Sequence, residues 1–125
     1  MTDLFARILL GHLVGDYLLQ NKAMMLKKSE KGLNGVLWCT IHCLVYTTAV
    51  CLFLWTINPW VIIAVFISHW PIDRWSLGTK WMKLIHSREL KDDYPENKVF
   101  YAIVYVAVDN TWHLVLMWLA INLLL

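Results

Sequence analysis

Residues 36–56 form a stretch that contains no charged side chain. A helix of about 20 apolar residues is long enough to cross the hydrocarbon core of a membrane, so this stretch predicts a membrane-spanning helix. The whole chain of 125 residues is 59% hydrophobic, with a mean hydropathy of +0.53. Soluble domains are usually about 45–50% apolar, and the eight tryptophans suit anchoring at a membrane surface. We therefore expect an all-α integral membrane protein.

Three further apolar stretches predict three more helices. They cover residues 4–20, 60–75 and 99–125, and the first is able to continue to Met25. Nothing at the start of the chain resembles a cleavable signal peptide, so we expect the first helix to remain in the mature protein. The expected fold is a four-helix bundle that forms one transmembrane domain over residues 1–125.

The segment around the end of the third helix carries two local signals. Pro71 is expected to interrupt that helix, because proline lacks a backbone donor and leaves the carbonyl of Ile67 free. Residues 76–90 then place apolar and basic side chains on opposite helical faces. This pattern predicts an amphipathic helix that lies along the membrane surface between helices 3 and 4.

Basic residues are concentrated in two of the three connections between the predicted helices. They are Lys22, Lys27, Lys28 and Lys31 in the first connection, and Arg74, Lys80, Lys83, Arg88, Lys91 and Lys98 in the third. The positive-inside rule places both connections in the cytoplasm and both termini outside, which predicts a multi-pass inner-membrane protein. Because topology accounts for the basic residues, membrane lipid is the expected partner and nucleic acid is not.

Histidine and aspartate recur four residues apart in three apolar segments. The pairs are His12 with Asp16, His69 with Asp73, and Asp109 with His113. Residues four apart share one face of a helix, and random placement of this chain's histidines and aspartates yields only about half a pair. Ionisable groups are costly inside a membrane. We therefore expect the three pairs, together with His42 in the uncharged stretch, to meet in the cytoplasmic half of the bundle.

These residue types are those that bind divalent metal ions. The candidate ligands are His12, Asp16, His42, His69, Asp73, Asp109 and His113, of which the three aspartates are also the candidate catalytic residues. A tetrahedral zinc ion takes three or four ligands. Seven candidate ligands suit two ions with a bridging carboxylate, or one ion whose ligands are supported by hydrogen bonds from the remaining residues. Zinc is the expected metal, with manganese and iron as alternatives. The competing interpretation is that the pairs only form hydrogen bonds across the bundle.

The motifs resemble those of an uncharacterised family of small bacterial and phage inner-membrane proteins, known only as a domain of unknown function. The similarity rests on HxxGDxxLQ from His12 to Gln20, on HxxID from His69 to Asp73, and on the late Asp–His pair, and it covers nearly the whole chain. More distantly, the arrangement is similar to that of LexA-induced inner-membrane proteins described as metal-dependent hydrolases. This second resemblance implies metal-dependent hydrolysis.

The first functional hypothesis is a membrane-embedded, metal-dependent hydrolase that acts on a lipid-linked phosphate or ester near the cytoplasmic face. The basic connections are able to attract an anionic headgroup. A metal-ion or proton carrier or channel is the second hypothesis, and with so few helices it requires a homo-oligomer. The third is a non-enzymatic phage or bacterial membrane effector, which leaves the His–Asp pairs unexplained.

Overall fold

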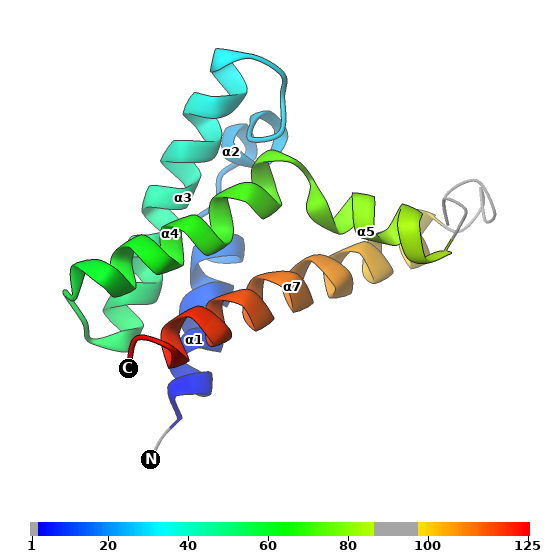
Figure 1. Cartoon of the computed structure of the whole chain (residues 1–125). Coiled ribbons are helices and arrows are strands. Elements are labelled where there is room, and N and C mark those ends of the chain that lie inside the picture. Colours follow the sequence, from blue (N-terminus) through cyan, green and yellow to red (C-terminus); the bar gives the residue numbers. More distant parts are fainter. Residues whose placement is uncertain (1–2, 87–97) are drawn as a thin grey trace.

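The computed structural model describes residues 3–86 and 98–125, and the regular elements in this part of the chain are all helices (Figure 1). They are α1 (Leu4–Leu13), the π-helix η1 (Val14–Leu18), α2 (Lys22–Lys27), α3 (Leu33–Leu54), α4 (Pro59–Arg74), α5 (Leu77–His86) and α7 (Lys98–Asn122). The prediction of an all-α fold is confirmed for these residues.

Four helices pack against one another in a closed order. Helix α1 packs on α3, α3 on α4, α4 on α7, and α7 returns to α1. Both termini lie at the same end of this arrangement, away from α5 (Figure 1). Helix α4 begins immediately after a short turn, because Asn58 accepts a hydrogen bond of 3.0 Å from the Trp60 amide and Pro59 occupies the first helical turn.

Two of these helices meet the length and hydropathy expected of a membrane span. They are α3 over Leu33–Leu54 and the part of α7 from Val99 to Asn122. Helices α1 and α4 contain 10 and 16 residues, which is short of the roughly 20 that a span requires. The two longer helices are consistent with membrane association. The number of spans and their direction stay predictions.

The optional extension of the first helix is absent, and the predicted interruption at Pro71 is wrong. The first helix does not continue to Met25, because η1 ends at Leu18 and a new helix begins after Asn21, whose side chain accepts from the Met24 amide at 2.9 Å. Helix α4 runs through Pro71 without interruption, and the Trp75 amide donates to the Pro71 carbonyl at 3.1 Å. Pro71 lies in the last turn, so few backbone bonds depend on its missing donor.

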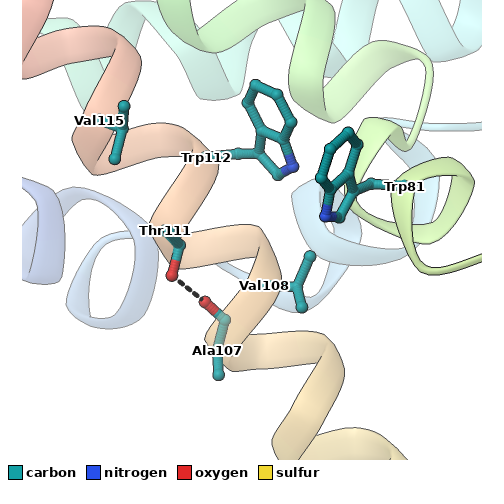
Figure 2. A pocket seen from close by; sticks show the side chains of 6 residues that line it. All are labelled: Trp81, Ala107, Val108, Thr111, Trp112 and Val115. Carbon is teal, nitrogen blue, oxygen red and sulfur yellow. Dashed lines mark hydrogen bonds between the residues drawn. The ribbon is translucent and has the colours of Figure 1, made fainter. Parts of the chain in front are cut away.

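The predicted amphipathic segment is present as α5, from Leu77 to His86. The remainder of that prediction, including Arg88, lies outside the described residues. Helix α5 packs on α7, where the rings of Trp81 and Trp112 meet edge to face with centroids 5.2 Å apart. The two rings line an apolar cavity of about 340 Å³, and Figure 2 shows the side chains that line it.

An apolar core fills the half of the bundle that lies toward the termini. Its buried members are Ile8, Tyr46, Val50, Leu54, Val61, Val65, Met117 and Ile121. These residues lie one to three helical turns along their own helices from histidines of the predicted site. The same helix faces are therefore apolar in one half of the bundle and polar in the other.

Close packing of α1 on α3 depends on a glycine. A Cβ atom added at Gly11 would lie 2.8 Å from the backbone Cα of Val50. No side-chain rotation is able to relieve a contact with backbone, so any larger residue at this position must separate the two helices.

We expect Gly11→Ala to lower the free energy of unfolding. Overpacking costs about 1–3 kcal/mol, against up to ~1 kcal/mol gained from the better helix propensity of alanine. Thermal unfolding in detergent measures the difference, and Leu10→Ala on the exposed face of α1 is the control. A Gly11→Ala protein that is more stable than the native chain would contradict this packing.

Candidate metal centre

The seven predicted ligands gather in one part of the bundle. His12 comes from α1, Asp16 from η1, His42 from α3, His69 and Asp73 from α4, and Asp109 and His113 from α7. Six of them are buried, and the side chain of Asp109 is 20% exposed. Among the buried polar side chains in the described part of the chain, only Thr47 lies outside this set.

Four of these residues form a first group of candidate metal ligands. Ligand atoms of Asp16, His42, His69 and Asp73 all lie within 4.8 Å of one another. The Nε2 atoms of His42 and His69 are 3.0 Å apart, and His42 Nε2 lies 3.0 Å from Asp73 Oδ2. Two imidazole nitrogens bound to one zinc ion at ~2.0–2.1 Å are themselves about 3 Å apart. The spacing therefore fits ligands that share one ion.

The Asp16 carboxylate supports the same conclusion. Its Oδ1 atom lies 3.1 Å from His42 Nε2 and 3.5 Å from His69 Nε2. The oxygen is buried and has no hydrogen bond of good geometry with the described residues. Buried acceptors normally have a partner, and a cation held between these atoms would supply one.

A second group shares one residue with the first. It consists of Asp73, Asp109 and His113. His113 Nε2 lies 3.2 Å from Asp73 Oδ1 and 3.5 Å from Asp109 Oδ2. Asp73 thus faces the first group with Oδ2 and the second with Oδ1. The two groups are able to hold one ion each, with the Asp73 carboxylate between them.

Aromatic stacking holds the imidazoles in place. The Tyr46 ring stacks on His69 with centroids 3.6 Å apart, and His69 in turn lies 4.2 Å from His113. The Nδ1 atoms of His42, His69 and His113 make no hydrogen bond with the described residues. All three rings therefore direct Nε2 toward the carboxylates.

His12 lies beside the two groups and belongs to neither. Its Nε2 lies 2.5 Å from Asn110 Oδ1, and its Nδ1 lies 2.8 Å from the Tyr46 hydroxyl. The Asn110 amide is oriented by donation from its Nδ2 to the Val106 carbonyl, so its Oδ1 accepts from His12. His12 then donates through Nε2, and its Nδ1 faces the Tyr46 hydroxyl, which also lies 3.6 Å from Met117 Sδ. In this arrangement His12 positions Tyr46 and Asn110.

The π-helix η1 begins between His12 and Asp16. The Leu19 amide donates to the Val14 carbonyl, which lies five residues earlier, as in a π-turn. Asp16 Oδ2 lies 3.5 Å from His12 Nδ1, while Asp16 Oδ1 lies near the imidazoles of α3 and α4.

Sequence reasoning missed one charged residue of the site. Lys28 Nζ lies 2.7 Å from Asp73 Oδ2, and the lysine side chain is only 18% exposed. Burial lowers the pKa of the Lys28 ammonium, but the Asp73 carboxylate outweighs burial and holds this pKa above its ordinary value. No motif distinguishes Lys28 from the neighbouring lysines, because the contact joins residues 45 positions apart.

The cluster is open on one side. A cavity of about 310 Å³ reaches it, and the cavity is lined by Asp16, Asp73, Asp109, Lys28, Gln20 and Ser76, among others. Away from this cavity, Tyr46 belongs to the apolar core and stacks on His69 of the cluster. A molecule that enters from outside thus meets all three carboxylates and the ammonium.

A family model described as "Protein of unknown function (DUF3307)" matches residues 4–125. The chain belongs to the DUF3307 family. The comparisons with curated proteins and with solved structures found no match. The expected membership in an uncharacterised family is supported, and a relationship to LexA-induced hydrolases stays a prediction. The function of this DUF3307 protein is therefore inferred from the cluster itself.

We expect the DUF3307 protein to bind divalent metal through Asp73 in particular. Asp73→Asn removes a ligand from both groups and should abolish most of the bound zinc, whereas Asp109→Asn affects one group and should remove about half. His12→Gln should retain the metal. Elemental analysis of chelator-free protein measures the content, with Asp3→Asn at the exposed start of α1 as the control. Native zinc content in Asp73→Asn would exclude these groups as metal sites.

Proposed function

We propose that this protein is a membrane-embedded, metal-dependent hydrolase that cleaves an ester or phosphoester of a lipid-linked substrate. The observation that carries the proposal is the pair of ligand groups that share Asp73 beneath an open polar cavity. Divalent ions bound there would supply Lewis-acid chemistry for the hydrolysis. Asp16, Asp73 and Asp109 are the proposed catalytic residues, since they line the cavity in which substrate meets the ions.

The chain's own residues have distinct tasks in this proposal. Asp16, His42 and His69 would hold one ion, Asp109 and His113 would hold a second, and Asp73 belongs to both ligand groups. The stack of Tyr46 on His69, and of His69 on His113, keeps the imidazoles aligned. Zinc is the metal we propose, because imidazole with carboxylate suits it well.

The shape of the cluster favours catalysis over transport. A carrier or channel requires a polar path that continues toward the other side of the membrane. Beyond Tyr46, the bundle is filled by the apolar core that includes Ile8, Val65 and Met117. A polar site that opens on one side and is closed by apolar packing on the other suits a reaction pocket.

The surroundings of the cavity suit an amphiphilic substrate. The turn of α7 that carries Asp109 also carries Ala107 and Val108, which line the apolar cavity beside Trp81 and Trp112 (Figure 2). A headgroup in the polar cavity and an acyl chain along α7 would use both surfaces. With both basic connections in the cytoplasm, as the positive-inside rule requires, this entrance faces the cytoplasmic leaflet of the inner membrane.

Turnover by purified protein tests the proposal. Zinc-loaded protein in detergent should hydrolyse bis(p-nitrophenyl) phosphate or p-nitrophenyl butyrate, and removal of metal with phenanthroline should abolish the reaction until zinc is restored. Loss of a residue that merely supports a metal ligand costs about 10–100-fold, so Asp73→Asn should cost at least ~100-fold.

Lys27→Met is the matched control, because Lys27 Nζ lies over the Trp38 ring at 5.3 Å and outside the cluster. Metal-independent turnover, or full activity of Asp73→Asn, would refute the proposal. Zinc flux in proteoliposomes without turnover in detergent would favour transport in its place.

A further inference from the structure

The charges in the cluster determine which kind of substrate it is able to hold. The carboxylates of Asp16, Asp73 and Asp109 and the ammonium of Lys28 leave a net charge of minus two when the histidines are neutral. Two divalent ions turn this into a net charge of plus two. Buried charge is costly unless it is paired, and bound ions are the largest charges in such a site. The loaded site therefore requires an anion.

Lys28 is placed to take part in binding that anion. Its Nζ contacts Asp73 Oδ2, the same oxygen that lies 3.0 Å from His42 Nε2 and 3.2 Å from His69 Nε2. An ion held by the first ligand group would compete with Lys28 for this oxygen, and the ammonium would then be available to another partner. The flexible lysine stem lines the open cavity, where an entering anion offers that partner.

The rest of the cavity wall suits a phosphate group. Gln20, Ser29, Ser76 and Tyr105 line it together with Lys28, and their amide and hydroxyl groups are hydrogen-bond donors. A phosphomonoester carries close to two negative charges near neutral pH. Its charge balances that of the metal-loaded site, whereas a neutral ester leaves the positive charge uncompensated.

We propose that the cavity binds a phosphomonoester group, with Lys28 as the residue that binds its oxyanion next to the metal ions. This inference rests on the proposed metal-dependent function and names the substrate class of the same site. Lys28 then has two opposing effects: its ammonium competes with metal for Asp73, and it favours phosphate once the metal is bound. A lysine with a purely structural role would not produce opposite effects on the two ligands.

Calorimetry with zinc and with inorganic phosphate tests the inference on the full chain in neutral detergent. We expect Lys28→Met to bind zinc more tightly than the native protein, because the competing ammonium is gone. We expect the same variant, loaded with zinc, to bind phosphate about 10- to 100-fold more weakly, the range for loss of a hydrogen bond to a charged group. Lys28→Arg should stay near the native phosphate affinity, and Lys27→Met should match the native protein in both titrations.

The outcomes separate this inference from the function on which it rests. Absence of stoichiometric zinc from the native protein overturns both. Zinc binding combined with equal phosphate affinities for Lys28→Met and native protein overturns the phosphate inference alone. Equal phosphate affinity in metal-free and zinc-loaded native protein also overturns it. Retained zinc in Lys28→Met shows that the variant is folded.

The source of the phosphate group is resolved with two further probes. Glycerol 3-phosphate presents the group in water, and phosphatidic acid in mixed micelles presents it on a lipid. Lys28-dependent binding that is tighter for phosphatidic acid supports a lipid phosphomonoester, and equal affinities support a soluble one. Lys28-independent binding of both probes overturns the inference.

Discussion

The carboxylate of Asp73 is the point on which the polar half of the structure depends. Nitrogen atoms of Lys28, His42, His69 and His113 all lie within 2.7–3.2 Å of its two oxygens. These nitrogens come from the segment after α2 and from α3, α4 and α7. A buried carboxylate is costly unless it is paired and hydrogen-bonded, so the helices that surround it must supply compensating groups. This requirement joins distant parts of the chain and also creates two ligand groups with one shared residue.

The apolar half of the bundle makes this arrangement tolerable. Tyr46 stands at the boundary, with its ring on His69 and its hydroxyl on His12. Beyond it, the helices meet through aliphatic side chains and through the close approach at Gly11. The apolar side excludes water from the imidazoles, which strengthens electrostatic interactions, while the cavity beside Lys28 reaches all three carboxylates. A site that is closed by apolar packing on one side and opens beside the Lys28 ammonium on the other suits an anionic group.

Much of the candidate site was predictable from the sequence. The predictions that failed concern local helix geometry. The pairs His69–Asp73 and Asp109–His113 lie on regular helix, so spacing four correctly placed both members in the cluster. The pair His12–Asp16 crosses into a π-helix; Asp16 joins the first ligand group, while His12 contacts Tyr46 and Asn110. The prediction that Pro71 breaks α4 failed because the proline lies in the last turn.

The sequence alone determined the helical character of the chain, its apolar stretches and the recurrence of histidine and aspartate, because helical periodicity is a local property that residue spacing records. Tertiary structure decided which of these residues meet. Only packing of α3, α4 and α7 makes Asp73 the shared carboxylate, and only the path of the chain after α2 brings Lys28 to it. Such contacts join residues tens of positions apart, where no spacing rule applies and the cost of buried charge selects the partner.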